Sequence, residues 1–92
     1  MTRFVPLYNL ILLDDDHHSY DYVVALLVTL FGMEIQKAYQ CAVEVDGSGR
    51  CIIMTDALER VEFKRAQVDA FGPDPLIRSS RGAMSTTIEA CP

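Results

Sequence analysis

Residues 8–23 of this chain read YNLILLDDDHHSYDYV, and this stretch decides the fold. The apolar run at residues 7–13 predicts a central strand that is buried on both faces. Three carboxylates follow at positions 14–16, and the polar residues up to Ser19 can cap the next helix. Folding alone rarely needs three adjacent carboxylates beside a core, so they predict a site that holds a cation next to an apolar pocket.

The composition limits the chain to one small domain. Its 92 residues, half of them hydrophobic and 23% charged, suffice for one packed core and argue against disorder. The net charge of −5 argues against nucleic acid or an anionic membrane as a partner and favours an amine-bearing ligand. We predict a single domain over residues 1–92, with a short N-terminal tail at 1–7 and a core at 8–91.

The cysteines are odd in number and include no Cys-x-x-Cys pair; they are Cys41, Cys51 and Cys91. We therefore expect inert cysteines, with neither a disulfide framework nor a zinc finger, which suits a reducing cytoplasm. The N-terminus does not resemble a signal peptide, and no segment approaches the roughly 18 apolar residues of a membrane span. The predicted location is the cytoplasm.

The rest of the chain predicts three helices and two further strands. Along the second helix, Ile35, Ala38, Ala42 and Val45 recur at helical spacing, and residues 46–49 are a strong turn signal. The order strand-helix-helix-strand-helix-strand predicts an α+β fold, a small α/β sandwich with three helices on one face of a three-stranded sheet. The expected helices are 20–31, 34–45 and 56–71, and the expected strands are 50–55 and 84–90.

The acidic stretch and the elements after it resemble the ClpS family, adaptors of the bacterial Clp protease. The family's mark is a strand that ends in Asn-Asp-Asp, then one residue, then Thr-Pro-Met-Glu-Phe-Val-Val, and residues 14–24 stand in that place. The similarity runs without gaps from Tyr8 to about Ala70, and residues 84–89 resemble the family's last strand after a loop of different length. The resemblance implies an antiparallel sheet, no catalytic activity and no cofactor.

The resemblance also implies a function. The family binds substrates whose first residue is Leu, Phe, Tyr or Trp and passes them to the N-terminal domain of a Clp AAA+ unfoldase. A free N-terminus is an ammonium group next to a side chain, so its recognition needs acceptors and an apolar hole. Each charge-assisted hydrogen bond contributes roughly 1.5–3 kcal/mol, and burial of a large apolar side chain contributes about as much.

Carried over position by position, the resemblance assigns site residues. Asp14, Asp15 and Asp46 would take the ammonium group. On the third helix, Glu59 and Lys64 match family positions that contact the unfoldase. The residues that would line the side-chain pocket are His18, Tyr20, Val23, Ala42, Val45 and Met84.

The chain departs from the family pattern at three site positions. Asp14 replaces an amide and Asp46 replaces a histidine, which predicts stronger attraction for an ammonium group or mutual repulsion that raises one carboxylate pKa. Tyr20 replaces a methionine, and with the smaller Ala42 it predicts a reshaped pocket with an altered preference among Leu, Phe, Tyr and Trp. Only seven residues precede Tyr8, so we expect delivery to differ from that of relatives with a longer N-terminal extension.

The residues alone leave alternatives open. The acidic triplet is also typical of a solvated, helix-capping loop, and with His17 and His18 it could bind a metal. The apolar pocket positions would ordinarily be core, Asp46 a turn residue, and Glu59 and Lys64 a solvated helix face. The alternative function is a ClpS-like interaction domain that has lost amine recognition and docks on or inhibits the unfoldase. A metal-dependent enzyme is more distant.

Overall fold

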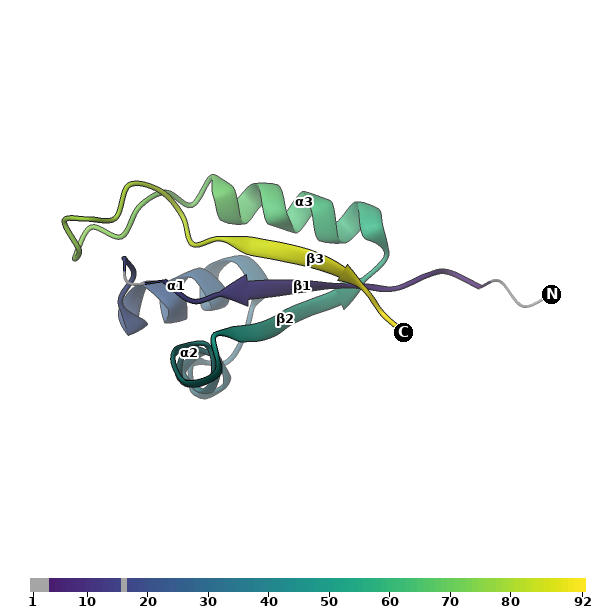
Figure 1. Ribbon diagram of the computed structural model, residues 1–92, viewed down its shortest axis with the longest axis horizontal. Coiled ribbons are helices and arrows are strands. Elements are labelled where there is room, and N and C mark those ends of the chain that lie inside the picture. Colours follow the sequence, from purple (N-terminus) through teal and green to yellow (C-terminus); the bar gives the residue numbers. More distant parts are fainter. Residues whose placement is uncertain (1–3, 16) are drawn as a thin grey trace.

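The computed structural model describes residues 4–15 and 17–92, and within them the predicted order of elements is confirmed (Figure 1). Residues 1–3 of the predicted tail and Asp16 of the acidic triplet lie outside the described residues. Within the described ranges, no helix is both apolar and long enough to span a membrane. The elements are β1 (Tyr8–Leu13), α1 (Tyr20–Phe31), α2 (Ile35–Ser48), β2 (Arg50–Asp56), α3 (Leu58–Asp69) and β3 (Thr86–Ala90).

β1 is the central strand of an antiparallel sheet with the order β2-β1-β3. Leu10 pairs with Met54 of β2 on one side and with Ile88 of β3 on the other. The pairing of β1 with β2 is irregular between Leu10 and Ile11, as in a β-bulge, because Leu10 pairs with Met54 but Ile11 pairs with Ile52. Leu10, Ile11 and Leu12 are fully buried, and because consecutive strand residues face opposite ways, this confirms a strand that is covered on both faces.

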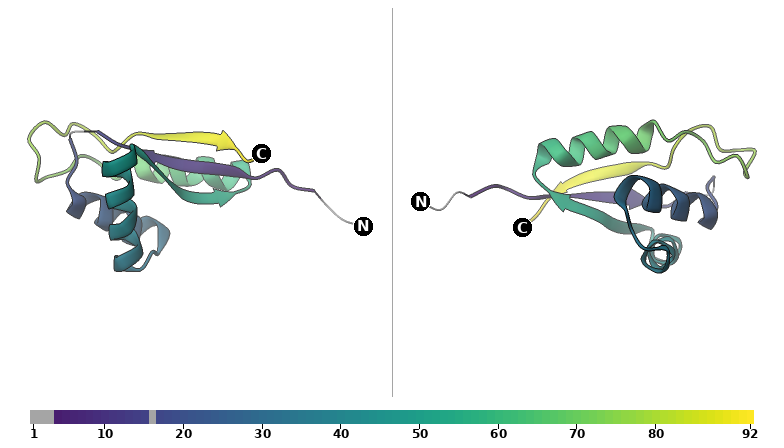
Figure 2. Two further views of the ribbon diagram at one scale, coloured as in Figure 1. Left: turned by 60° about the horizontal axis from the view of Figure 1, so that its bottom comes forward. Right: turned by 180° about the vertical axis from the view of Figure 1, so that it is seen from behind.

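One apolar cluster joins the sheet to all three helices, as the predicted fold class requires. Leu10 and Leu12 face the helices from β1, and their cluster includes buried residues of α1, α2 and α3. Figure 2 shows α3 running along the strands, whereas α2 crosses them steeply. The helical members with the least exposure are Leu26, Leu27, Ala38, Val61 and Val68.

The structure differs from the prediction at both ends of α2. The helix continues through the predicted turn to Ser48, and Gly49 closes it in the left-handed conformation with φ 87°. Asp46 therefore belongs to the last turn of α2 and not to a loop. Ile35 is 69% exposed, because it is the first residue of the helix and the buried stripe begins one turn later at Ala38.

Cys41 and Cys51 form a disulfide between α2 and β2, so the expectation of unpaired cysteines is wrong for these two. The turn at Gly49 folds β2 back along α2 and brings the two Cα atoms to 6.1 Å. That separation lies within the range of roughly 4.4–6.8 Å that disulfides span. Both cysteines are buried, whereas Cys91 is a free thiol.

Candidate functional site

The acidic stretch begins where β1 ends, and its backbone is held from two sides. The Leu13 amide donates to the Ser85 carbonyl at 3.0 Å, and the Asp14 amide donates to the Gly49 carbonyl at 3.0 Å. At the far end of the stretch, the Ser19 hydroxyl accepts from the Tyr22 amide at 3.2 Å, which confirms the predicted helix cap. The two ends of the loop are therefore anchored, the first by hydrogen bonds to the end of α2 and to the segment that leads into β3, and the second by the helix cap.

Asp14, Asp46 and Tyr20 lie together on the α2 side of this loop. The Tyr20 hydroxyl donates to Asp46 Oδ2 at 2.6 Å. This hydrogen bond, followed by partial burial and the charges of Asp46 and Asp14, raises the pKa of Tyr20 to about 12. The Tyr20 ring also meets the Tyr39 ring edge-on, with centroids 5.7 Å apart. Both carboxylates are exposed, so a cation in solution can reach them.

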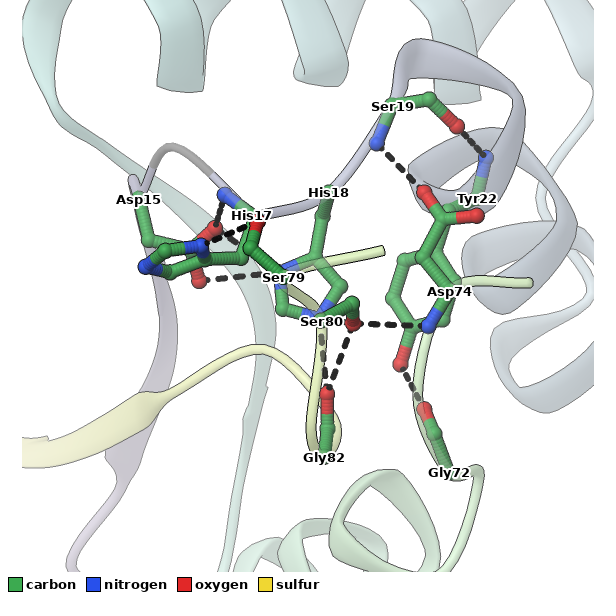
Figure 3. Close-up of polar contacts among 10 residues, drawn as sticks. All are labelled: Asp15, His17, His18, Ser19, Tyr22, Gly72, Asp74, Ser79, Ser80 and Gly82. Carbon is green, nitrogen blue, oxygen red and sulfur yellow. Dashed lines mark hydrogen bonds and ion pairs between the residues drawn. The ribbon is translucent and has the colours of Figure 1, made fainter. Parts of the chain in front are cut away.

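Asp15 lies between that acidic side and a buried histidine. Its Oδ1 accepts from the His17 amide at 2.8 Å, and the Nδ1 atom of His18 lies 2.8 and 2.9 Å from its two oxygens. His18 Nε2 lies 2.8 Å from the Gly82 carbonyl, which can only accept (Figure 3). With a side chain only 4% exposed, His18 thus joins Asp15 to the loop before β3, a place that its prediction as a pocket residue did not anticipate.

The structure brings the other predicted pocket residues together, but as parts of the packed core. Val23, Ala42, Val45 and Met84 are each at most 4% exposed and belong to the central cluster. Tyr20 packs against this cluster from the solvent side. The predicted pocket is therefore closed in this structure. The side chain of a ligand could enter the cluster only after a covering side chain, such as that of Tyr20, moved away.

Asp74 is the site residue that the sequence did not reveal. Its side chain is 2% exposed, with Oδ2 accepting from the Ser19 amide at 2.6 Å and Oδ1 accepting from the Leu76 amide at 2.9 Å. Burial by itself would raise the pKa of Asp74, but these hydrogen bonds and the nearby charge of His18 hold it below its usual value. A charged Asp74 therefore anchors the start of α1.

Further contacts dock the segment 72–85 on the same helix start (Figure 3). The Tyr22 hydroxyl donates to the Gly72 carbonyl at 2.6 Å, and His17 Nδ1 lies 2.8 Å from Ser79 Oγ. The sequence predicts only a loop over this segment. The prolines on both sides of Asp74 indicate a turn but do not reveal which residues the segment contacts. The docked segment forms one wall of the candidate site.

The predicted partner residues lie at the other end of the sheet, since Figure 1 shows α3 starting far from the end of β1. Glu59 is exposed in the first turn of α3. Lys64 Nζ donates to the Leu30 carbonyl and lies 5.4 Å from the Phe31 ring centroid, so it also closes the end of α1. Glu59 and Lys64 share a hollow of about 320 Å³ with Phe63, which is 65% exposed.

The fold and the candidate site define a small α+β domain, in which exposed carboxylates border a covered apolar cluster. Within residues 4–15 and 17–92, no group of three or more His, Cys, Asp and Glu side chains is placed to hold a metal ion. Residues 4–75 match the family described as ATP-dependent Clp protease adaptor protein ClpS. The chain belongs to the ClpS family, which confirms the predicted resemblance.

Individual relatives agree with this assignment. The chain is 36% identical over 66 residues to the ClpS adapter protein of Xanthomonas campestris pv. campestris, which covers 72% of this chain. The match spans only 62% of that relative's length. The identity to the ClpS adapter protein of Vibrio atlanticus is 32% over 75 residues, or 79% of this chain and 71% of that protein.

One solved structure matches almost the whole fold. Agrobacterium tumefaciens ClpS2 bound to L-phenylalaninamide matches with a TM-score of 0.79, covering 94% of this chain and 98% of that one. At 19% sequence identity, this likeness shows the fold, including the antiparallel sheet and its three helices.

Proposed function

We propose that this chain is an adaptor that binds proteins through a hydrophobic N-terminal residue and delivers them to a Clp AAA+ unfoldase. The observation that carries the proposal is the position of Asp14 and Asp46, two exposed carboxylates at the edge of the apolar cluster that Tyr20 covers. An α-ammonium group and the side chain beside it need this pairing of acceptor and apolar space. The proposed role is binding alone, with no catalytic step and no cofactor.

Asp14, Asp46 and Asp15 supply the acceptors in this proposal. Asp46 has a second oxygen besides the one that holds the Tyr20 hydroxyl, and Asp14 is exposed. Each charge-assisted hydrogen bond to the ammonium group contributes roughly 1.5–3 kcal/mol. With the burial of a Leu, Phe, Tyr or Trp side chain and the cost of association, micromolar binding, on the order of −8 kcal/mol, is reasonable.

The ligand of the Agrobacterium protein supports the same chemistry. L-Phenylalaninamide carries a free α-amino group next to an aromatic side chain, as does a protein that begins with Phe. In this chain, Val23, Ala42, Val45 and Met84 would surround such a side chain once Tyr20 swings aside. His18 would act from behind Asp15 instead of lining that space.

The proposed contact with the N-terminal domain of the unfoldase lies on α3. Glu59 and Lys64 border the hollow beside the exposed Phe63 ring, so an apolar anchor and charges of both signs occur together. This surface is remote from the acidic loop, and an adaptor has to hold a substrate and an unfoldase at once. Both partners suggest a cytoplasmic location.

Acetylation of the substrate N-terminus tests the proposal. A labelled peptide that begins with Phe is expected to bind at least about tenfold more tightly than its N-acetylated form, because acetylation removes the charge and its hydrogen bonds. Fluorescence anisotropy titration measures both affinities, and the same peptide with Ala at position one is the control for the side-chain pocket. Equal affinity for the free and acetylated peptides would favour the docking or inhibitory domain that has lost amine recognition.

The contact between Tyr20 and Asp46 gives a second prediction. The Tyr20→Phe variant keeps the aromatic ring but loses the hydrogen bond to Asp46, so both the Asp46 carboxylate and the covering ring are free to move. A peptide that begins with Phe is therefore expected to bind about two- to fivefold more tightly. Tyr39→Phe is the matched control, because the structure describes no hydrogen bond from its hydroxyl. Weaker binding by Tyr20→Phe would mean that the hydroxyl itself contacts the ligand.

A further inference from the structure

A second hollow lies beside Asp15, and apart from Asp15 and His18 its lining has no part in the proposed function. Its volume is about 520 Å³, and its polar lining consists of Asp15, His17, His18, Ser79, Arg81 and Ser85. The hydrogen bond from the Leu13 amide to the Ser85 carbonyl, 3.0 Å long, anchors one wall directly beside the acidic loop. The contact of His17 with Ser79 fixes the other wall.

The charges differ on the two sides of Asp15. On the α2 side, Asp14 and Asp46 are exposed carboxylates. On the side of the hollow, Arg81 brings a permanent positive charge, and the carboxylate of Asp15 already accepts from His17 and lies against His18. Both ring nitrogens of His18 are engaged, with Asp15 and with the Gly82 carbonyl. Although the whole chain carries a net charge of −5, the guanidinium of Arg81 gives this hollow a cationic donor.

We propose that this hollow receives the side chain of the second residue of the substrate and favours an acidic one. The inference rests on the proposed function, because the α-ammonium group must lie at Asp14, Asp15 and Asp46. Consecutive Cα atoms are about 3.8 Å apart, so the second residue lies within reach of a hollow that shares Asp15 with the ammonium site.

Arg81 is the residue that sets this preference. Its guanidinium carries five N–H donors in a planar fork that matches a carboxylate, and its side chain is exposed at the hollow. His17 Nδ1 and Ser79 Oγ are engaged with each other, so they shape the wall without competing for the ligand. A bound substrate would thus place its ammonium charge on the acidic side and its carboxylate on the donor side.

The test compares two peptides that begin Phe-Glu and Phe-Gln and are otherwise identical, so that only the charge of the second residue differs. The wild-type protein is expected to bind Phe-Glu about two- to fivefold more tightly at low ionic strength. The Arg81→Ala variant is expected to bind the two peptides about equally and to keep the wild-type affinity for Phe-Gln. The Arg81→Lys variant is expected to retain part of the preference for Phe-Glu. Arg78→Ala is the matched control, because Arg78 is an exposed arginine of the same segment that does not line the hollow.

The outcomes separate this inference from the proposed function. If Phe-Gln binds and is sensitive to acetylation but Phe-Glu binds no better, the second-residue site is refuted and the adaptor proposal stands. The site is also refuted if Arg81→Ala leaves the ratio of the Phe-Glu and Phe-Gln affinities unchanged. It is likewise refuted if Arg78→Ala lowers this ratio as much as Arg81→Ala does, because the preference would then come from the overall positive charge of the segment. If neither free peptide binds, both proposals fail.

Discussion

The Asp74→Ala variant is expected to lose about 2–4 kcal/mol of unfolding free energy. Asp74 is almost fully buried and holds two backbone amides, those of Ser19 and Leu76. Alanine leaves both donors in place without their acceptor, and an unsatisfied buried polar group costs roughly 1–3 kcal/mol. Because Ser19 is the N-cap of α1, the loss extends to the start of that helix.

Urea unfolding followed by circular dichroism measures this loss. Asp74→Asn retains the shape and one acceptor oxygen, so its stability is expected to fall between those of wild type and Asp74→Ala. Glu62→Ala is the control, because Glu62 is an exposed carboxylate on α3 and its removal should change stability by no more than about 0.5 kcal/mol. An Asp74→Ala protein within that same margin would show that the two amides find other partners.

The contribution of Asp74 also depends on pH. Its pKa in the folded protein is held below the usual value, whereas in the unfolded chain it returns to about 3.9. A lowered folded pKa means that the stabilisation is complete above the unfolded pKa and is lost as the pH falls through the folded one. The stability difference between wild type and Asp74→Asn should therefore be constant well above the unfolded pKa of about 3.9 and shrink as the pH falls below it.

The sequence predicted β1 and α1 well because their signals are local. An uninterrupted apolar run defines the strand, and Ser19 with the following apolar residues defines the start of the helix. The turn signal at residues 46–49 led to a predicted helix end at residue 45 that is too early, because α2 continues to Ser48 and Gly49 alone closes it. A turn signal several residues long does not say which of its residues closes the helix.

The acidic stretch that contains Asp14 predicted a cation site without the family pattern. Asp46 and Tyr20 came only from matched family positions, and the structure brings them together with Asp14. Asp74 could not be found in this way, because its partner Ser19 lies 55 positions away and the segment between Gly72 and β3 has no periodic pattern. A buried carboxylate in such a segment has the same sequence signature as a solvated one.

The sequence contained a signal for the disulfide, but the odd number of cysteines outweighed it in the prediction. Cys41 lies on the buried stripe of α2 beside Ala42, and Cys51 alternates inward with Ile53 in β2. Two inward cysteines on consecutive elements that a tight turn joins are close in space. The odd number of cysteines argued the other way, although one unpaired thiol, Cys91, accounts for it.

Reduction of the bond between Cys41 and Cys51 is expected to lower the unfolding free energy by about 2–3 kcal/mol. The bond closes a loop with a sequence separation of 10, and cross-linking a loop of this size removes conformational entropy from the unfolded chain. For a domain of this size, the change corresponds to a fall in Tm of roughly 10–20 °C. The effect is large relative to the whole, because a domain of this size buries a smaller fraction of its surface than a larger one and is only marginally stable.

Thermal unfolding with and without a dithiol reductant tests this prediction, and the three cysteines provide their own controls. Cys91→Ser keeps the bonded pair, so it should lose as much Tm on reduction as wild type does. Cys51→Ser cannot form the bond, so it should melt near the reduced protein and ignore the reductant. If the reductant leaves Cys91→Ser unchanged while Cys51→Ser is destabilised, the cost comes from packing a hydroxyl at the buried Cys51 position, and the cross-link contributes nothing. Because α2 also carries Asp46, the same bond ties the helix of one proposed ammonium acceptor to β2.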